Sequence, residues 1–187
     1  MNKRIIYGVM AGGGIVGLVA SFLQIIEKLY LLSNTNKVLA CDLGSVFSCS
    51  SVLKAWQSSV FGFPNSLLCI VFFTVFAVTG LAGLSGAVLP RGFRIGVHAL
   101  SLFVLGFAAW FLSQSIYVIG ALCILCLFCF GGLLLVNWAW VQINASDLPI
   151  GERGRAVVAR AIKNNTDILV WVVIAALLTF AILLRFY

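Results

Sequence analysis

The chain has 187 residues, of which 63% are hydrophobic and only 9% are charged. Soluble domains carry about 25% charged residues and about 45–50% apolar ones. A chain this short cannot hide so much apolar surface from water, which excludes a soluble domain. The net charge of +7 would suggest nucleic acid in a polar chain, but these cations stand in short clusters between apolar runs. We therefore predict an all-α integral membrane protein that contacts membrane lipids and no nucleic acid.

Five apolar runs are long enough to cross a bilayer as helices, which takes about 20 residues each. They cover about residues 5–26, 64–84, 93–112, 119–141 and 168–184. Too few residues remain for a large domain outside the membrane. We therefore predict a single membrane domain over residues 1–187 with five spans.

The basic residues of the short loops predict the orientation, because cytoplasmic loops carry the excess of Lys and Arg. With the N-terminus inside, eight cations are cytoplasmic: Lys3, Arg4, Arg91, Arg94, Arg153, Arg155, Arg160 and Lys163. Four are outside: Lys28, Lys37, Lys54 and Arg185. We expect a multi-pass protein of the cell (inner) membrane with a cytoplasmic N-terminus.

Residues 33–60 form the only long polar stretch on the predicted outer side. Within it, apolar residues recur at roughly helical spacing: Val46, Val52, Leu53 and Trp56. We predict a short helix near 46–57 that lies along the outer membrane surface, with Ser45 or Ser48 as its N-cap.

The six cysteines fall in a pattern that depends on membrane depth. They are Cys41, Cys49, Cys69, Cys123, Cys126 and Cys129. Cys41 and Cys49 lie in the outer loop, and Cys123 and Cys126 lie in the first turns of the predicted fourth span. Two pairs that are distant in sequence thus converge on one face of the membrane, which in a bacterium is the oxidising face.

A Cys-x-x-Cys motif at a helix start suits redox cycling. Positions i and i+3 share a helical face, and their separation allows a disulfide. The free amides at the helix N-terminus favour a thiolate there, which promotes exchange. Deeper in the membrane, Cys69 and Cys129 are predicted to pack as small apolar residues.

A metal site is the competing interpretation of the same residues. Cys123, Cys126 and Cys129 give the spacing of some iron–sulfur ligand runs, and four outer cysteines could bind zinc. The expected fourth iron–sulfur ligand is missing. His98, the only histidine, falls at the opposite end of the third span, where we expect an interfacial residue. We therefore predict no metal.

Three segments together resemble the vitamin K epoxide reductase family, in its bacterial disulfide-forming branch. They are Cys41-Asp42-Leu43-Gly44-Ser45-Val46-Phe47-Ser48-Cys49-Ser50, Phe61-Gly62-Phe63-Pro64-Asn65-Ser66 and Cys123-Ile124-Leu125-Cys126. Their order, spacing and predicted depth agree with the family over about residues 5–141. The resemblance implies a four-helix bundle around a quinone, plus a fifth helix.

The resemblance also implies an electron relay through the four outer cysteines. In it, Cys41 exchanges with a thioredoxin-like protein outside the membrane. Cys49 passes electrons to Cys123 through a transient mixed disulfide, and Cys126 faces the quinone and reduces it. Bacterial members often carry a fused thioredoxin-like domain after the fifth span. Because this chain ends at Tyr187, we expect the partner to be a separate protein.

The family positions around the quinone are only partly matched. Asn65 occupies the position that hydrogen-bonds a quinone carbonyl. Ala55 stands where many members carry a serine, and Phe130 stands where animal members carry a tyrosine. The other expected apolar walls are Leu53, Phe72 and Phe73. The two missing hydroxyl groups favour simple quinone reduction over epoxide chemistry.

Three functions therefore compete. The first is a quinone-dependent thiol oxidoreductase that supports disulfide bond formation, with menaquinone, ubiquinone or a vitamin K type quinone as acceptor. The second is a vitamin K epoxide or quinone reductase that uses the same cysteine relay. The third is a non-enzymatic membrane carrier with a structural disulfide. Glu27 and Lys28 lie at the outer end of the first span, and the other four spans contain almost no ionisable residues. This disfavours the carrier, because transporters use ionisable residues inside the membrane.

Overall fold

The computed structural model describes residues 2–33, 39–44 and 46–186, and within them the fold is helical. The elements are α1 (Lys3–Ser33), α2 (Cys49–Lys54), η1 (Trp56–Ser59), α3 (Asn65–Leu84), α4 (Arg91–Gln114), η2 (Ser115–Ile119), α5 (Ile124–Asn144), α6 (Gly151–Lys163) and α7 (Thr166–Phe186). The described residues contain no β-strand, although one isolated parallel bridge joins Phe47 to Leu122. The predicted all-helical class is confirmed.

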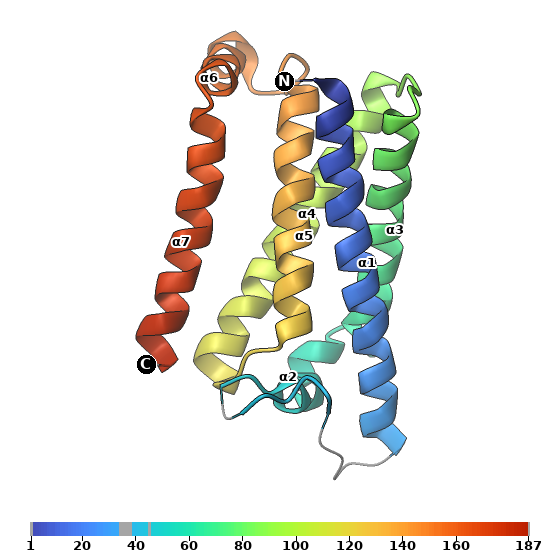
Figure 1. Ribbon diagram of the computed structural model, residues 1–187, viewed down its shortest axis with the longest axis vertical. Coiled ribbons are helices and arrows are strands. Elements are labelled where there is room, and N and C mark those ends of the chain that lie inside the picture. Colours follow the sequence, from blue (N-terminus) through green and yellow to red (C-terminus); the bar gives the residue numbers. More distant parts are fainter. Residues whose placement is uncertain (1, 34–38, 45, 187) are drawn as a thin grey trace.

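Five of these helices are long and apolar enough to cross a membrane: α1, α3, α4 continued by η2, α5 and α7. The prediction of five long apolar helices is therefore confirmed. Figure 1 shows α1, α3, α5 and α7 standing roughly along the long axis of the molecule and α4 crossing behind α5 at a tilt, with α2 at one end of the bundle and the N-terminus at the other.

The helix ends differ from the predicted span limits at the end of the bundle that carries α2. The first helix continues beyond residue 26 to Ser33, and the third continues beyond residue 112 through η2. The fourth begins at Ile124 rather than at residue 119. Gly120 explains this last difference, because its φ of +71° ends η2 in a left-handed conformation that glycine adopts without strain.

Four helices form the bundle, in which α1 packs on α3 and α5, and α4 packs on α5. α1 and α3 approach each other closely because glycine has no side chain. A Cβ at Gly14 would lie 2.6 Å from the backbone nitrogen of Ala77. Phe73, Phe76 and Trp140 fill the interior and are completely buried. Small residues at the crossing and large ones beside it are typical of helix packing in membranes.

The fifth membrane helix, α7, stands at the edge of the bundle (Figure 1). Most of its described side chains are exposed, but Asp167 at its start is buried. The Asp167 carboxylate accepts hydrogen bonds from Trp138 Nε1 at 3.0 Å and from the side-chain amide of Gln142. One end of α7 is thereby fixed to α5.

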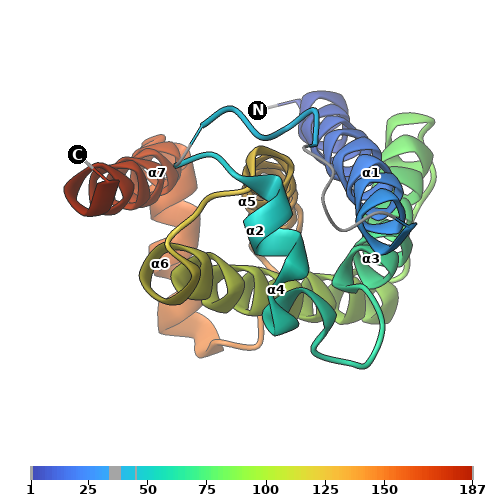
Figure 2. The same ribbon diagram turned by 90° about the horizontal axis from the view of Figure 1, so that it is seen from below.

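The short helix predicted near 46–57 is present but shorter, as α2 over Cys49–Lys54. Ser48 is its N-cap, and the Ser48 hydroxyl accepts a hydrogen bond from Ser51 N at 3.3 Å. The alternative cap, Ser45, lies outside the described residues. Figure 2 shows α2 lying across the end of the bundle. Its position on a membrane surface stays a prediction.

Candidate redox site

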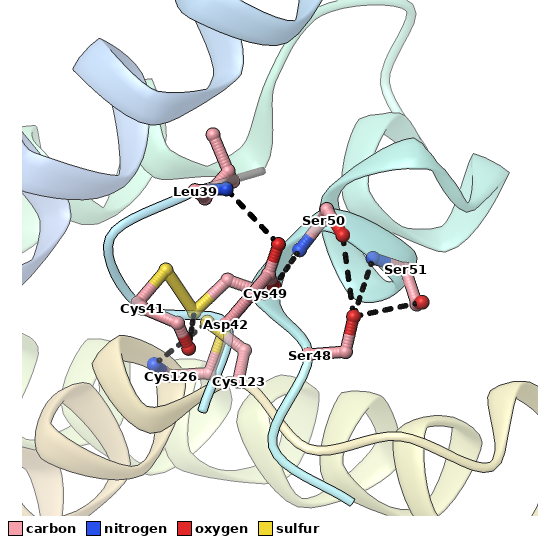
Figure 3. Close-up of a disulfide and its surroundings, with 9 residues drawn as sticks. All are labelled: Leu39, Cys41, Asp42, Ser48, Cys49, Ser50, Ser51, Cys123 and Cys126. Carbon is pink, nitrogen blue, oxygen red and sulfur yellow. Dashed lines mark hydrogen bonds between the residues drawn. A yellow bond between two sulfur atoms is a disulfide. The ribbon is translucent and has the colours of Figure 1, made fainter. Parts of the chain in front are cut away.

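Two backbone hydrogen bonds place the two cysteine pairs beside each other. Leu122 N donates to the carbonyl oxygen of Val46 at 2.8 Å, and Ser48 N donates to that of Leu122 at 3.0 Å. Cys49 directly follows Ser48, and Cys123 directly follows Leu122. These two hydrogen bonds therefore place Cys49 and Cys123 in one apolar cluster. Figure 3 shows the two cysteine pairs side by side.

Cys41 and Cys49 form a disulfide, with their Cα atoms 5.8 Å apart. Both are buried, Cys49 completely and Cys41 with 8% of its surface exposed. An incoming protein thiol cannot reach either sulfur unless the surrounding chain moves. We call residues 46–60, which include α2 and η1, the cap segment.

Asp42 organises the loop around this disulfide (Figure 3). Its carboxylate accepts hydrogen bonds from Leu39 N at 3.1 Å and from Ser50 N at 2.9 Å. Burial raises the pKa of Asp42, but the hydrogen bonds from the Ser50 and Leu39 backbone and from the Ser50 and Ser48 side chains outweigh it. The pKa of Asp42 is therefore lowered from 3.8. The ionised carboxylate thus ties both ends of the disulfide loop together.

Cys123 and Cys126 are free thiols at the start of α5. Cys123 is the N-cap, and its sulfur accepts a hydrogen bond from Cys126 N at 3.4 Å. The sequence places both inside the helix, which is wrong for Cys123, because α5 begins one residue later. The pair keeps the i and i+3 relation that a disulfide needs, at the end of the helix that stabilises negative charge.

Cys69 and Cys129 behave as the packing residues predicted from their depth. Cys129 is buried in the bundle core, and Cys69 packs against the same core. The Cys129 sulfur lies 3.4 Å from both Ser21 Oγ and Gln24 Nε2. Both cysteines also line the cavity described next.

A cavity lies inside the bundle beneath the cap segment, and Cys123 and Cys126 form part of its wall. Most other lining side chains are apolar, among them Leu53, Phe73, Val104, Phe107, Ala108, Phe111, Leu112, Phe130 and Leu133. The polar lining residues are Gln24, Lys28, Ser58, Asn65, Ser66 and Ser115. The wall is largely apolar and carries a few hydrogen-bond donors, which suits a flat apolar ring with carbonyl acceptors.

The cavity includes four of the six residues expected around a quinone, namely Leu53, Asn65, Phe73 and Phe130. The other two are absent from its described lining. Ala55 joins α2 to η1, and Phe72 packs against the bundle core instead. On α3, the Phe72 side chain points about 100° away from that of Phe73, and it contacts the core rather than the cavity.

The Asn65 side chain holds the cap segment as well as lining the cavity. Asn65 Nδ2 donates to the carbonyl oxygen of Gln57 at 2.7 Å, and Asn65 Oδ1 accepts from Val60 N at 3.2 Å. One N–H of the amide remains for another acceptor. Asn65 therefore joins the start of α3 to η1.

The sequence analysis missed Lys28 as a site residue. The Lys28 ammonium donates to the carbonyl oxygen of Leu53 and to Ser58 Oγ, so it joins α1 to the cap segment. Lys28 is also the only cationic side chain in the described cavity wall. The signal was present in the sequence, since a lysine near the end of an apolar run needs polar partners.

His98 was wrongly expected at the membrane interface. Its side chain is buried between helices and stacks on Trp140, with ring centroids 6.2 Å apart. Its Nδ1 lies 3.3 Å from Asn144 Nδ2. Over the described ranges, no group of three or more His, Cys, Asp or Glu side chains is placed to hold a metal ion.

No curated protein matches this chain. A family model does match it, under the description Vitamin K epoxide reductase family, over residues 8–141. This range contains most of the four-helix bundle, both cysteine pairs and the residues that line the cavity. The family implies a cysteine-based membrane oxidoreductase. The match covers well over half of the residues, and the chain belongs to the vitamin K epoxide reductase family.

Proposed function

We propose that this protein is a quinone-dependent thiol oxidoreductase that supports disulfide bond formation. In this proposal electrons pass from a reduced thioredoxin-like protein through Cys41 and Cys49, then through Cys123 and Cys126, to a membrane quinone. One observation carries it: the Cys41–Cys49 disulfide and the Cys123/Cys126 thiols share one apolar cluster, and the second pair lines the cavity.

The outer step is an exchange between the partner's two thiols and the Cys41–Cys49 disulfide. A partner thiolate attacks Cys41 Sγ, and Cys49 leaves as a thiolate. The second partner thiol then attacks the mixed disulfide and releases Cys41. The partner has lost two electrons and two protons, and Cys41 and Cys49 have gained them.

The inner step returns this pair to the disulfide. Cys49 attacks the sulfur of Cys123 while Cys123 is bonded to Cys126, and Cys126 leaves as a thiolate. Cys41 then attacks Cys49 and releases Cys123, so the electrons have moved to Cys123 and Cys126. The arrangement described here, an outer disulfide above two inner thiols, corresponds to the end of this step.

The residues of the cavity suit the final acceptor. Leu53, Phe73 and Phe130 would cover the faces of a quinone ring, and Asn65 and Lys28 would offer hydrogen bonds to its oxygens. When bound, a quinone takes up the two electrons and two protons that the Cys123 and Cys126 thiols lose on forming their disulfide. The cap segment above this cavity limits the entry of water.

Simple quinone reduction is favoured over epoxide reduction. Phe130 lines the cavity without a hydroxyl group, and Ala55 lies at the junction of α2 and η1 without one. Opening an epoxide needs proton donation to the leaving oxygen. Two of the serine hydroxyl groups in the wall, those of Ser58 and Ser115, already donate to backbone carbonyl oxygens. Menaquinone, ubiquinone and a vitamin K type quinone all present the ring that this wall would cover.

The compartment is part of the proposal. Thiol oxidation is sustained on the oxidising side of a cell membrane. We place Cys41 and Cys49 on the periplasmic or extracytoplasmic side of the cell (inner) membrane and the N-terminus in the cytoplasm. The thioredoxin-like partner then acts outside the membrane.

The test uses the purified full chain in lipid nanodiscs, with a reduced thioredoxin-like protein and a short-chain quinone. We expect equal molar loss of partner thiol pairs and of quinone. Cys126→Ala should stop quinone reduction, while one-turnover exchange at Cys41 persists. The matched control is Cys69→Ala, which removes another cavity thiol and should keep turnover. Full turnover by Cys126→Ala would refute the relay.

A further inference from the structure

The helix α6 lies at the end of the bundle away from the cysteines and runs across the direction of the spans. Figure 1 shows α6 nearly along its axis, while the adjoining α7 is seen from the side, and Figure 2 shows the same crossing from below. α6 joins α5 to α7, both of which are candidate membrane spans. A helix held crosswise at the ends of two spans lies at the depth of the lipid headgroups.

The sequence of α6 gives it two faces. Val157 and Ala161, and next to them Val158 and Ile162, repeat every four residues and form an apolar side. The side of α6 that is turned toward the protein includes part of this face, because Val158, Ala161 and Ile162 are half-buried. Val157 stays 65% exposed, and no residue of α6 is fully buried.

The remaining surface of α6 is basic. It carries four cations and one carboxylate: Arg153, Arg155, Arg160, Lys163 and Glu152. Within the described ranges, none of the four cations forms an ion pair, since the salt bridges found there join Arg91 and Arg94 to Asp147. This excess of positive charge on an exposed surface attracts anionic groups.

We propose that α6 binds the surface of an anionic bilayer. In this arrangement Val157 and its apolar neighbours enter the boundary between headgroups and acyl chains. The arginines and Lys163 contact lipid phosphates. The crosswise axis, the exposed apolar position and the unpaired cations are the three properties of a helix that lies in the membrane interface. The same cluster of cations beside membrane spans is typical of recognition of anionic lipids.

The first test measures hydrogen–deuterium exchange in the full-length protein, reconstituted in two bilayers. One contains phosphatidylcholine alone, and the other contains phosphatidylcholine mixed with phosphatidylglycerol. Each basic residue near an anionic surface contributes about five-fold in affinity. We therefore expect exchange in residues 151–163 to slow by about five-fold or more in the anionic bilayer. Equal exchange in the two bilayers would overturn the proposal.

Variants separate lipid binding from simple helix stability. Arg153→Gln combined with Arg160→Gln should reduce the difference between the two bilayers, since two of the four cations of α6 are then lost. Arg185→Gln, which removes a cation in the last turn of α7, should keep it. Retention of the Cys41–Cys49 disulfide, checked by mass under non-reducing conditions, reports that each variant has folded.

The apolar face has its own matched pair of variants. Val157→Asn places an amide on the exposed apolar side, and Ala156→Asn places the same amide one residue away on the basic side. We expect faster exchange in α6 for Val157→Asn than for Ala156→Asn in the anionic bilayer. Identical exchange in these two variants would contradict an inserted apolar face, whatever the wild-type comparison gives.

Discussion

Ser48 and Leu122 are joined through their backbones, with Ser48 N donating to the Leu122 carbonyl oxygen at 3.0 Å. Each is followed by a cysteine of a different pair. A second hydrogen bond, from Leu122 N to Val46 at 2.8 Å, fixes the register between the two segments. A shift of one residue along a bridge turns side chains to the opposite side, so this register decides whether Cys49 faces Cys123.

The first prediction concerns this register. Leu122→Pro removes the N–H that binds Val46, whereas Leu122→Ala keeps it and removes only side-chain atoms. In a background of Cys41→Ser and Cys126→Ser, oxidation should trap the Cys49–Cys123 disulfide. One lost hydrogen bond of about 1 kcal/mol should lower the trapped fraction about five-fold in Leu122→Pro. Quantitative mass spectrometry of non-reduced peptides measures this fraction.

Leu122→Ala is the control for the loss of packing around the bridge. The Leu122 side chain is buried, so some loss of stability is expected in both variants. Only the proline variant should lose the selective trapping. An equal trapped fraction in Leu122→Pro and Leu122→Ala would show that the bridge does not set the meeting of the two cysteines.

The second prediction follows from Asp42, whose pKa is lowered from 3.8 by hydrogen bonds in the folded loop. When the pKa of a carboxyl group is lower in the folded state than in the unfolded state, its ionisation stabilises the fold at pH values above the unfolded-state pKa. That stabilisation disappears as the pH falls through the folded-state pKa. Reduction of the Cys41–Cys49 disulfide by a phosphine should therefore accelerate as the pH drops below about 4.

Asp42→Asn supplies the control for this pH dependence. The amide does not ionise, and its NH₂ group cannot accept from the backbone N–H of Ser50 or Leu39. We expect fast reduction in this variant at every pH and no acceleration in acid. Parallel pH profiles for the wild-type protein and Asp42→Asn would show that another group controls the loop.

The third prediction is that Lys28 holds the cap segment closed. Lys28→Met removes the donor that binds the Leu53 carbonyl oxygen and Ser58 Oγ. Hydrogen bonds from charged groups contribute about 1.5–3 kcal/mol, so opening of the cap should become at least about ten-fold more frequent. Alkylation of Cys123, which is 1% exposed in the closed arrangement, measures this opening.

Two variants serve as controls for the Lys28→Met measurement. Lys28→Arg preserves a cationic donor and should retain most of the protection of Cys123. Lys3→Met removes an exposed lysine at the other end of α1 and should change nothing. If Cys123 reacts at the wild-type rate in Lys28→Met, the cap segment is held by other contacts, such as those of Asn65.

The fourth prediction tests the contact between α1 and α3. Gly14→Ala would bring a Cβ to 2.6 Å from Ala77 N, and backbone at that position cannot yield easily. Overpacking of this kind costs about 1–3 kcal/mol. Gly12→Ala is the matched control on the same helix, because nothing lies within 4 Å of its Cβ position.

Thermal unfolding in detergent gives the readout for both glycine variants. Gly14→Ala should unfold at a lower temperature than the wild-type protein. Gly12→Ala should unfold at the same or a higher temperature, since alanine favours a helix by about 1 kcal/mol over glycine. A stable Gly14→Ala protein would mean that α1 and α3 can separate without loss.

Much of the architecture could be predicted from local features of the chain. A bilayer of fixed thickness makes the length of an apolar run a direct measure of a span, so five runs correctly predicted five helices. The Ser48 cap of α2 was predictable because a cap interacts with amides only three residues away. A search limited to long apolar runs missed α6, although alternating apolar and basic residues indicated it.

What depended on distant partners could not be predicted in this way. No local pattern shows that Val46 and Ser48 bind Leu122, that Lys28 binds the cap segment, or that Asn65 binds Gln57. Hydropathy likewise placed the start of α5 too early, because the left-handed turn at Gly120 is a backbone property. Local composition and spacing therefore decide which segments enter the membrane and where cysteines can react. Only the packing of helices, with hydrogen bonds between segments distant in sequence, decides which cysteines meet.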